Sequence, residues 1–252
     1  MTLQPFVWKD KPSLIEYLFP VQKISAESYK EQMSNQGKTL TALGSYWKGR
    51  KPLILNKACI LAAILPASEN LLKDLEIFEL LMGMDRLSMT KRLMASIPAN
   101  GHDELPQWLA AAYIEQVQKA KRPEELAEEV LFSHAWEKVN RHLGTSAFSF
   151  PELVEQMGIA RFGHRPKVAD VFCGSGQIPF EAARLGCDVY ASDLNPIACL
   201  LTWGAFNIVG SSYERQKELE TAQENLVENV QAEIDKLGVE TDGNDWRAKA
   251  FL

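Results

Sequence analysis

The sequence lacks the features that mark membrane, exported and metal-binding proteins. It has no run of about twenty apolar residues, and its amino terminus has no positive charge followed by an apolar segment. We therefore expect a cytoplasmic protein without a membrane association. The four cysteines form no C-x-x-C pair, and the four histidines show no metal-binding spacing. These spacings predict buried, reduced thiols and no metal site.

Positive charge is also scarce, because 27 lysines and arginines face 33 aspartates and glutamates, which gives a net charge of −6. This balance argues against DNA binding by bulk electrostatics, since phosphate contacts need local cations. Two local clusters could supply these cations. For each cluster the alternative interpretation is a solvated turn without a ligand. The first holds Lys38, Lys48, Arg50 and Lys51 around Tyr46 and Trp47, and the second holds Arg161, His164, Arg165 and Lys167.

The most informative segment that is present spans residues 168–198. Its apolar runs predict buried strands over residues 168–172 and 187–191. Between them, residues 178–185 have the composition of a helix, with Pro179 in the first turn, where a missing N–H costs nothing. The segment therefore predicts a β-α-β unit.

A glycine turn connects the first strand to this helix. Gly174 and Gly176 let the backbone turn sharply and leave room for a ligand close to the main chain. Asp193 follows the second strand, about twenty residues beyond the glycines, where a carboxylate can accept both hydroxyls of a ribose. The pattern favours an adenosine-bearing ligand over the alternative of an ordinary tight turn.

Two cofactor classes compete for such a site. A dinucleotide site needs a third small residue for tight helix packing, and Pro179 stands there, which disfavours a nicotinamide-dependent oxidoreductase. S-adenosylmethionine needs an aspartate at the first strand, open backbone at the turn and an acid for its ribose. Asp170, residues 173–176 and Asp193 supply these three features. The sequence therefore favours S-adenosylmethionine.

The same residues carry a family resemblance. The segments DVFCGSG (170–176), IPFEAARLGC (178–187) and ASDLNPIA (191–198) resemble DUF1156-type, adenine-specific DNA methyltransferases found near anti-phage systems. Further matching elements are Phe19-Pro20, residues 25–30 and residues 47–53, so that the resemblance spans about residues 15–65 and 165–210. The amino-terminal element departs from the family pattern, because Trp47 stands alone and Gly49 and Lys51 replace Ala and Arg.

The resemblance implies S-adenosylmethionine-dependent methylation of adenine N6 in DNA, in anti-phage defence. It places the methionine end of the cofactor at Asp170 and at the turn of Cys173, Gly174, Ser175 and Gly176, and it includes Phe172 among the cofactor-binding residues. Asp193 would hold the ribose, and Leu194 and Asn195 would border the adenine. Lys51 and Pro52 would close the carboxylate side, with a solvated basic loop as the alternative.

One element of that family is absent. Adenine methyltransferases carry an Asp/Asn-Pro-Pro-Tyr/Phe motif that binds the exocyclic amine and stacks on a flipped base, whereas this sequence contains no Pro-Pro pair. Its catalytic residues are therefore unknown, and whether the chain is an enzyme by itself is left open. The sequence favours either a donor-binding part that a protein partner completes, with DNA bound by the full enzyme or complex, or a non-catalytic binding or assembly subunit of a defence complex.

The predicted fold is α/β. It consists of a partial Rossmann-like S-adenosylmethionine methyltransferase core, the β-α-β half within residues 165–252, preceded by a mainly helical region over residues 1–164. Apolar periodicity predicts helices over residues 24–33, 53–65, 71–84, 105–120, 124–143, 196–209 and 213–237. Ser149 predicts a further helix start. The last helix carries a regular apolar stripe, which should pack within the chain or against a partner.

Overall fold

The computed structural model describes residues 5–33 and 51–237, and it divides into two units, Met1–Thr202 and Trp203–Leu252. Within the described residues the two strands are β1 (Lys167–Asp170) and β2 (Asp188–Ala191). The α-helices are α1 (Leu14–Tyr17), α2 (Val21–Met33), α3 (Leu53–Ile64), α4 (Leu71–Leu81), α5 (Arg86–Ser96), α6 (Leu105–Ala110), α7 (Tyr113–Lys119), α8 (Glu128–Phe132), α9 (Trp136–Leu143), α10 (Phe150–Phe162), α11 (Gln177–Arg184), α12 (Pro196–Gly204) and α13 (Tyr213–Leu237). Short 3-10 segments cover Ala99–Glu104 and Pro123–Glu125.

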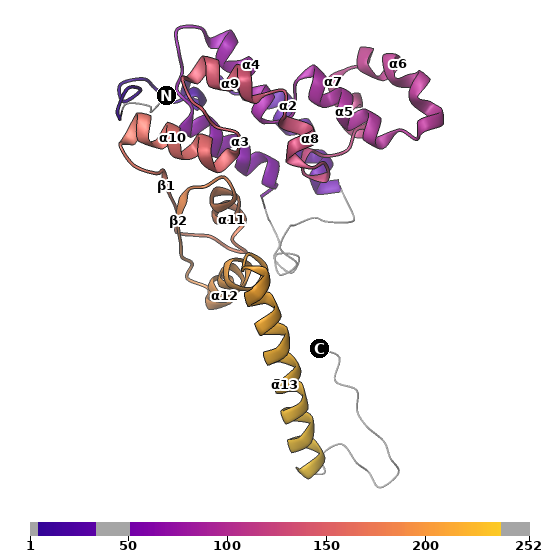
Figure 1. Cartoon of the computed structure of the whole chain (residues 1–252), viewed down its shortest axis with the longest axis vertical. Coiled ribbons are helices and arrows are strands. Elements are labelled where there is room, and N and C mark those ends of the chain that lie inside the picture. Colours follow the sequence, from indigo (N-terminus) through magenta and orange to yellow (C-terminus); the bar gives the residue numbers. More distant parts are fainter. Residues whose placement is uncertain (1–4, 34–50, 238–252) are drawn as a thin grey trace. The chain divides into compact units, whose positions relative to one another are not determined.

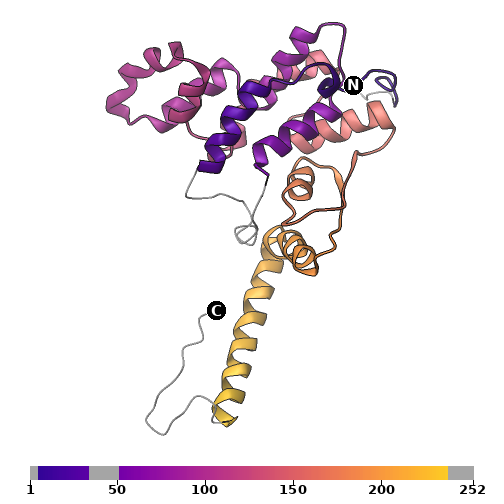
Figure 2. The same cartoon turned by 180° about the vertical axis from the view of Figure 1, so that it is seen from behind.

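The centre of the first unit is α3, which contacts α1, α2, α10 and α11 (Figures 1 and 2). Its sequence is apolar around almost its whole circumference, and this is typical of a helix that is covered on every side. Ala58, Leu61 and Ala62 are fully buried. Burying a side chain such as Leu61 contributes about 1.5–3 kcal/mol to stability. The helix therefore anchors the core that positions the later strands.

Local sequence signals set several helix starts. The Ser149 side chain accepts a hydrogen bond from the Glu152 N–H, and Pro151 lies in the first turn of α10, as predicted. Asn70 caps α4, and Asp85 caps α5 by accepting from two backbone N–H groups. Each cap satisfies N–H groups that have no partner inside their own helix.

The middle of the helical region is more broken than its periodicity predicts. The expected helix over residues 105–120 divides into α6 and α7 because Ala111 and Ala112 are extended. The break places Tyr113 at the start of α7, where its hydroxyl donates to Glu27 at 2.8 Å. The expected helix over residues 124–143 divides likewise, and α5 was not predicted. Tertiary contacts outweigh local helix propensity here.

A buried ion pair joins three of these helices. Arg92 of α5 donates two hydrogen bonds of 2.7 Å to the carboxylate of Glu27 on α2. Its remaining donors reach the carbonyl oxygens of Gly83 and Lys121, and Tyr113 of α7 also donates to Glu27. Both charged side chains are almost wholly buried. These hydrogen bonds are what makes such a burial of charge tolerable.

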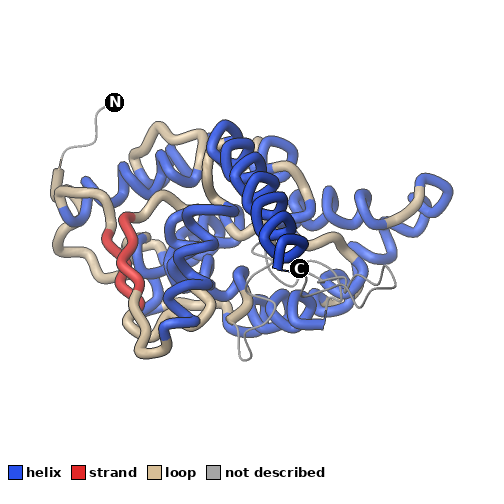
Figure 3. The backbone as a smooth tube through the Cα atoms, turned by 90° about the horizontal axis from the view of Figure 1, so that it is seen from below, coloured by secondary structure: helices blue, strands red, loops and turns tan. Residues whose placement is uncertain are grey.

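The two strands pair in parallel, with Lys167 opposite Asp188 and Asp170 opposite Ala191 (Figure 3). Val168 and Val189 pack against the core together with α11, whereas Tyr190, on the other face, is 63% exposed. The described residues contain no further strand. The described chain is thus mainly helical with a two-stranded parallel sheet, and the β-α-β order is the one that the sequence predicts. The prediction that both strands are buried is wrong, because one face of the pair is exposed and the first strand ends at Asp170 rather than at Phe172.

The second unit contains a π-helical turn (Ala205–Val209) and α13 (Figure 1). No residue of α13 is buried, and Leu226 and Val230 of its apolar stripe are exposed. The stripe is therefore present, but no covering is found for it in the described residues. No described helix, α13 included, is both long and apolar enough to cross a membrane.

The cysteines are free thiols, and their burial differs from the sequence prediction at one clear position. Cys173 and Cys187 are buried, Cys59 is half-buried, and Cys199 is exposed. Burial raises the pKa of Cys187 to about 11. Cys199 is solvent-exposed on α12, so the prediction of a buried thiol is wrong there.

Candidate cofactor-binding site

The turn after β1 lies at the carboxyl edge of the sheet. The Ser192 N–H donates to the Asp170 carbonyl at 2.9 Å, and the Cys173 N–H donates back to the Ser192 carbonyl at 3.0 Å. A third bond, from the Gly176 N–H to the Cys173 carbonyl, closes the turn itself. These bonds extend the strand pairing and bring the two sequence-predicted halves of the site together.

Asp193 binds directly to this turn. One carboxylate oxygen accepts from the Gly174 N–H at 2.9 Å, and the other accepts from the Asn195 N–H at 2.9 Å. These backbone hydrogen bonds hold the pKa of the Asp193 carboxyl below its usual value, so the side chain is ionised at neutral pH. Each carboxylate oxygen has a second lone-pair direction. Asp193 can therefore accept two ligand hydroxyls while it fixes the turn.

Gly176 is required by the local backbone. Its φ is +76°, and a Cβ built on it would lie 2.7 Å from the Thr202 hydroxyl oxygen. Thr202 donates in turn to the Gly174 carbonyl at 3.3 Å, so α12 holds the far side of the turn. The Ser175 hydroxyl is buried and has no hydrogen-bond partner among the described residues. The turn thus carries one unsatisfied polar group, as expected where a polar ligand binds.

The remaining predicted residues form an open rim. Phe172 is 76% exposed and Leu194 is 92% exposed, so both can contact a ligand only at the surface. Asp170 accepts from the Phe172 N–H at 3.1 Å, and the side-chain oxygen of Asn195 accepts from the Ile197 N–H at 3.0 Å. Asp170 and Asn195 therefore stabilise the backbone of the rim.

Lys51 and Pro52 lie elsewhere, immediately before α3. The Leu53 and Ile54 N–H groups at this helix start donate to the carboxylate of Glu31, at 2.8 and 3.1 Å. Burial raises the pKa of Glu31. A protein carboxylate thus occupies the place that the sequence assigns to the carboxylate of the cofactor. The role of Lys51 and Pro52 stays a prediction, and a ligand there would have to displace Glu31.

The second basic cluster does not present all its members to solvent. Arg161 is buried and donates to the carbonyl oxygens of Ala63, Ile64 and Leu65 at the end of α3. Its assignment to a solvent-facing basic cluster is therefore wrong, because the residue is buried and its two terminal nitrogens donate within the chain. His164, Arg165 and Lys167 are exposed. In the first cluster, Lys38, Tyr46, Trp47, Lys48 and Arg50 lie outside the described residues.

Two residues that stabilise this region were not identified from the sequence. Thr202 gives no local signal, because its contact with Gly176 depends on how α12 folds back on the turn. Glu31 resembles any polar residue near the end of a helix, and only its hydrogen bonds to α3 distinguish it. The described residues contain no group of three or more side chains that could hold a metal ion.

Comparison with known families gives one match. Residues 18–81 match a family model described as "Protein of unknown function (DUF1156)". The chain carries a DUF1156 region. This region ends at the last residue of α4 and includes α2 and α3, whereas the glycine turn and Asp193 lie outside it. No curated protein and no solved structure matches the chain.

Proposed function

We propose that this chain is the donor-binding part of an S-adenosylmethionine-dependent DNA adenine (N6) methyltransferase that acts in anti-phage defence. The observation that carries the proposal is the contact between Asp193 and the glycine turn. It joins an ionised acid at the end of β2 to the open backbone at the end of β1. An adenosine ligand needs both features side by side.

The residues present fit the cofactor at its ribose and at its amino acid end. Asp193 keeps lone pairs for the two ribose hydroxyls, and the unpaired Ser175 hydroxyl lies in the turn that would hold the methionine moiety. Leu194 would border the adenine, and Gly174 presents no side chain between the ligand and the main chain. The bound cofactor would supply the methyl group that is transferred to the exocyclic amine of adenine. This chain would contribute orientation of the donor.

A second component would supply the base-binding motif and cover the sheet. Tyr190, Phe172 and Leu194 are all more than half exposed at or beside the sheet. Parallel sheets are ordinarily buried on both faces. We infer that a protein partner, or a further segment, packs there and brings the Asp/Asn-Pro-Pro-Tyr element and DNA to the donor.

Isothermal titration of the purified chain with S-adenosylmethionine tests the proposal, with NAD as the comparison ligand. Asp193→Ala and Asp193→Asn should each lower the affinity at least tenfold, because a lost charge-assisted hydrogen bond costs about 1.5–3 kcal/mol. Asp188→Ala is the matched control, because Asp188 is an exposed carboxylate at the start of β2, the strand that Asp193 follows. Binding of NAD alone, or equal binding by Asp193→Ala, would contradict the proposal.

The alternative is a non-catalytic binding or assembly subunit of a defence complex. The exposed apolar side chains of Ile197 and Leu200 on α12, beside the turn, favour it. A folded chain that binds no S-adenosylmethionine, yet forms a stable complex with a neighbouring gene product through α12, would support this alternative. Loss of that complex in Leu200→Ser would assign the contact.

A further inference from the structure

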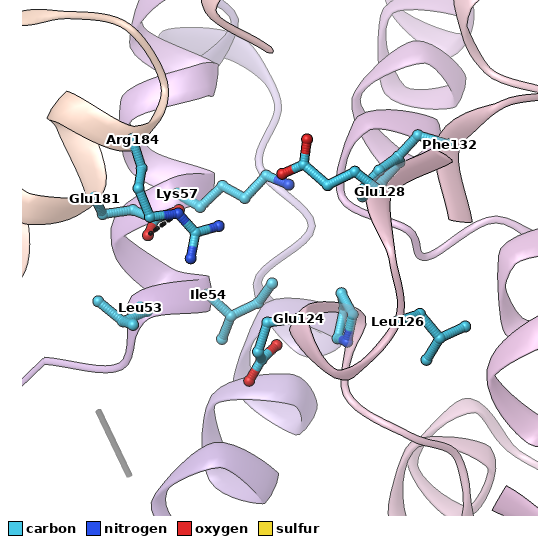
Figure 4. A pocket seen from close by; sticks show the side chains of 10 residues that line it. Leu53, Ile54, Lys57, Glu124, Leu126, Glu128, Phe132, Glu181 and Arg184 are labelled. Atoms are coloured by element: carbon cyan, nitrogen blue, oxygen red, sulfur yellow. Dashed lines mark ion pairs between the residues drawn. The ribbon is translucent and has the colours of Figure 1, made fainter. Parts of the chain in front are cut away.

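A cavity of about 270 Å³ lies where α3, α8 and α11 meet, in a part of the molecule that the cofactor proposal does not use. Its lining includes Lys57 from α3, Glu128 and Phe132 from α8, and Glu181 and Arg184 from α11. Figure 4 shows Lys57 extending from α3 toward the carboxylate of Glu128. The cavity is slightly smaller than the range of about 300–1,000 Å³ that drug-sized ligands occupy, which suits a small metabolite.

Lys57 is the first sign that the cavity takes a ligand. Its side chain is 93% buried, since the residue is only 7% exposed, and its ammonium lies 3.8 Å from the ring centre of Phe150 and 4.7 Å from that of Phe132. Among the described residues, Lys57 forms no hydrogen bond or ion pair. Two aromatic faces stabilise the charge in part. The three N–H donors of the ammonium are left without an acceptor.

Glu181 is a second and independent sign. The residue is 2% exposed, and one of its carboxylate oxygens is buried without a hydrogen-bond partner in the described part of the chain. The nearest cation is Arg184, whose Nε lies 3.7 Å away, beyond hydrogen-bond distance. Leaving a buried donor or acceptor without a partner costs about 1–3 kcal/mol for each group. Lys57 and Glu181, each with a polar atom that lacks a hydrogen bond to any described residue, therefore line the same cavity.

The charges that line the cavity narrow the class of ligand. A simple anion would meet Lys57 and Arg184 but would be repelled by Glu124, Glu128 and Glu181. A simple cation would meet the carboxylates but would leave Lys57 without an acceptor and lie beside two like charges. A molecule that carries both charges complements both sets of groups. Its anionic end would accept from Lys57, and its cationic end would donate to Glu181.

We propose that this cavity binds a small zwitterion of the α-amino acid class, with Lys57 holding the carboxylate and Glu181 the ammonium group. The site is independent of the S-adenosylmethionine proposal. The cavity is nevertheless lined by residues of α11, the helix that starts directly after Gly176 of the glycine turn. A ligand in the cavity would therefore contact the helix that follows the proposed cofactor site.

Titration calorimetry of the whole chain with each common amino acid in turn tests the site. At least one amino acid should bind, and Lys57→Met should weaken its binding at least about tenfold, as expected for the loss of a hydrogen bond to a charged group. Methionine keeps an unbranched side chain, one atom shorter than that of Lys57, and removes the ammonium that lies over the two rings. Thermal unfolding would establish that the variant is folded. Lys73→Met, which alters a partly exposed lysine on α4, is the control and should bind normally.

Ligands that lack one charge complete the test. Glycine should bind more tightly than acetate or methylamine, which each present only one of its two charged groups. Equal binding of acetate would reduce the site to an anion site, and absence of binding by every amino acid would overturn the proposal. Asp193→Ala should leave amino acid binding unchanged, whereas Lys57→Met should leave S-adenosylmethionine binding unchanged. The two proposals can therefore fail separately.

Discussion

The helical region and the sheet region of the first unit differ in which side chains they bury. In the helical region the charged group of Arg92 is buried with four hydrogen bonds to the chain, whereas at the sheet large apolar groups such as Phe172 and Leu194 lie in solvent. Burying a charge is unfavourable unless it has hydrogen-bond partners, and exposing large apolar side chains is unfavourable unless another surface covers them. The comparison teaches that the helical core supplies its buried ion pair with partners from the same chain, whereas the surface around the sheet exposes apolar side chains that a partner could cover.

The largest effect should come from breaking the buried ion pair of the helical region. Arg92→Met would leave the Glu27 carboxylate buried without its partner and should lower the free energy of unfolding by about 3–5 kcal/mol. Urea denaturation measures the change. Arg141→Met is the control, because the side chain of Arg141 is 75% exposed, and it should cost at most about 1 kcal/mol. Equal effects of both changes would mean that the buried network adds nothing.

The next effect depends on pH and concerns Lys57. Burial lowers the pKa of Lys57 to about 8 from its ordinary 10.5, in the field of Glu181, Arg184, Glu128 and Glu124. The unfolded chain then binds the proton more tightly, so the wild-type chain should gain stability as the pH rises from about 8 to about 10.5. The full gain corresponds to about 3 kcal/mol.

A matched variant isolates this effect from other titrations. Lys57→Met lacks the ammonium, so it should be more stable than wild type below pH 8, and the difference should shrink toward pH 10.5. Denaturation curves across this range measure it. A difference that is constant with pH would show that Lys57 keeps an ordinary pKa.

A smaller effect tests the turn that joins the sheet to the cofactor proposal. Gly176→Ala places a methyl group against Thr202 and forces a φ of +76° on alanine, which should cost about 2–3 kcal/mol. Gly144→Ala is the matched control, because its φ is +72° but no atom lies within 4 Å of the added Cβ. It should cost only about 1 kcal/mol. Thermal or urea unfolding compares the two, and equal losses would exclude a tight contact with Thr202.

The smallest effect should come from the exposed rim of the sheet. Leu194→Ser should change the free energy of unfolding by less than about 0.5 kcal/mol, because Leu194 is 92% exposed. Leu81→Ala, in the helical core, should cost about 2–5 kcal/mol. Leu194→Ser should also reduce the binding of an apolar dye to the native chain. Strong destabilisation by Leu194→Ser would mean that the rim is covered within the chain itself.

The sequence predicted the features that depend on neighbours along the chain. The cap at Ser149, the glycine turn and the second strand followed by Asp193 all have local signals, and the structure places them as predicted. The start of α5 could also have been found, because Asp85 is a strong N-cap residue. Local chemistry was therefore sufficient for most helix starts and for the β-α-β order.

The features that depend on distant segments were not predictable. The break before Tyr113 follows from a hydrogen bond to Glu27, 86 residues earlier in the chain. The burial of Lys57 depends on aromatic rings from α8 and α10. The apolar periodicity of α3 does not predict these contacts. The assignment of Arg161 to a surface cluster failed for the same reason, since its partners lie at the end of α3.

Arg161 has a further consequence for how the molecule holds together. Its guanidinium group joins α10 to the end of α3, and it also donates to the Lys11 carbonyl and the Ser13 hydroxyl. Three stretches far apart in the sequence thus meet at one planar group. A chain cut by a protease between α4 and α10 should therefore remain one particle, and two separately expressed fragments divided there should reassociate. The hydrogen bonds of the Arg161 guanidinium would hold the two fragments together without any covalent link.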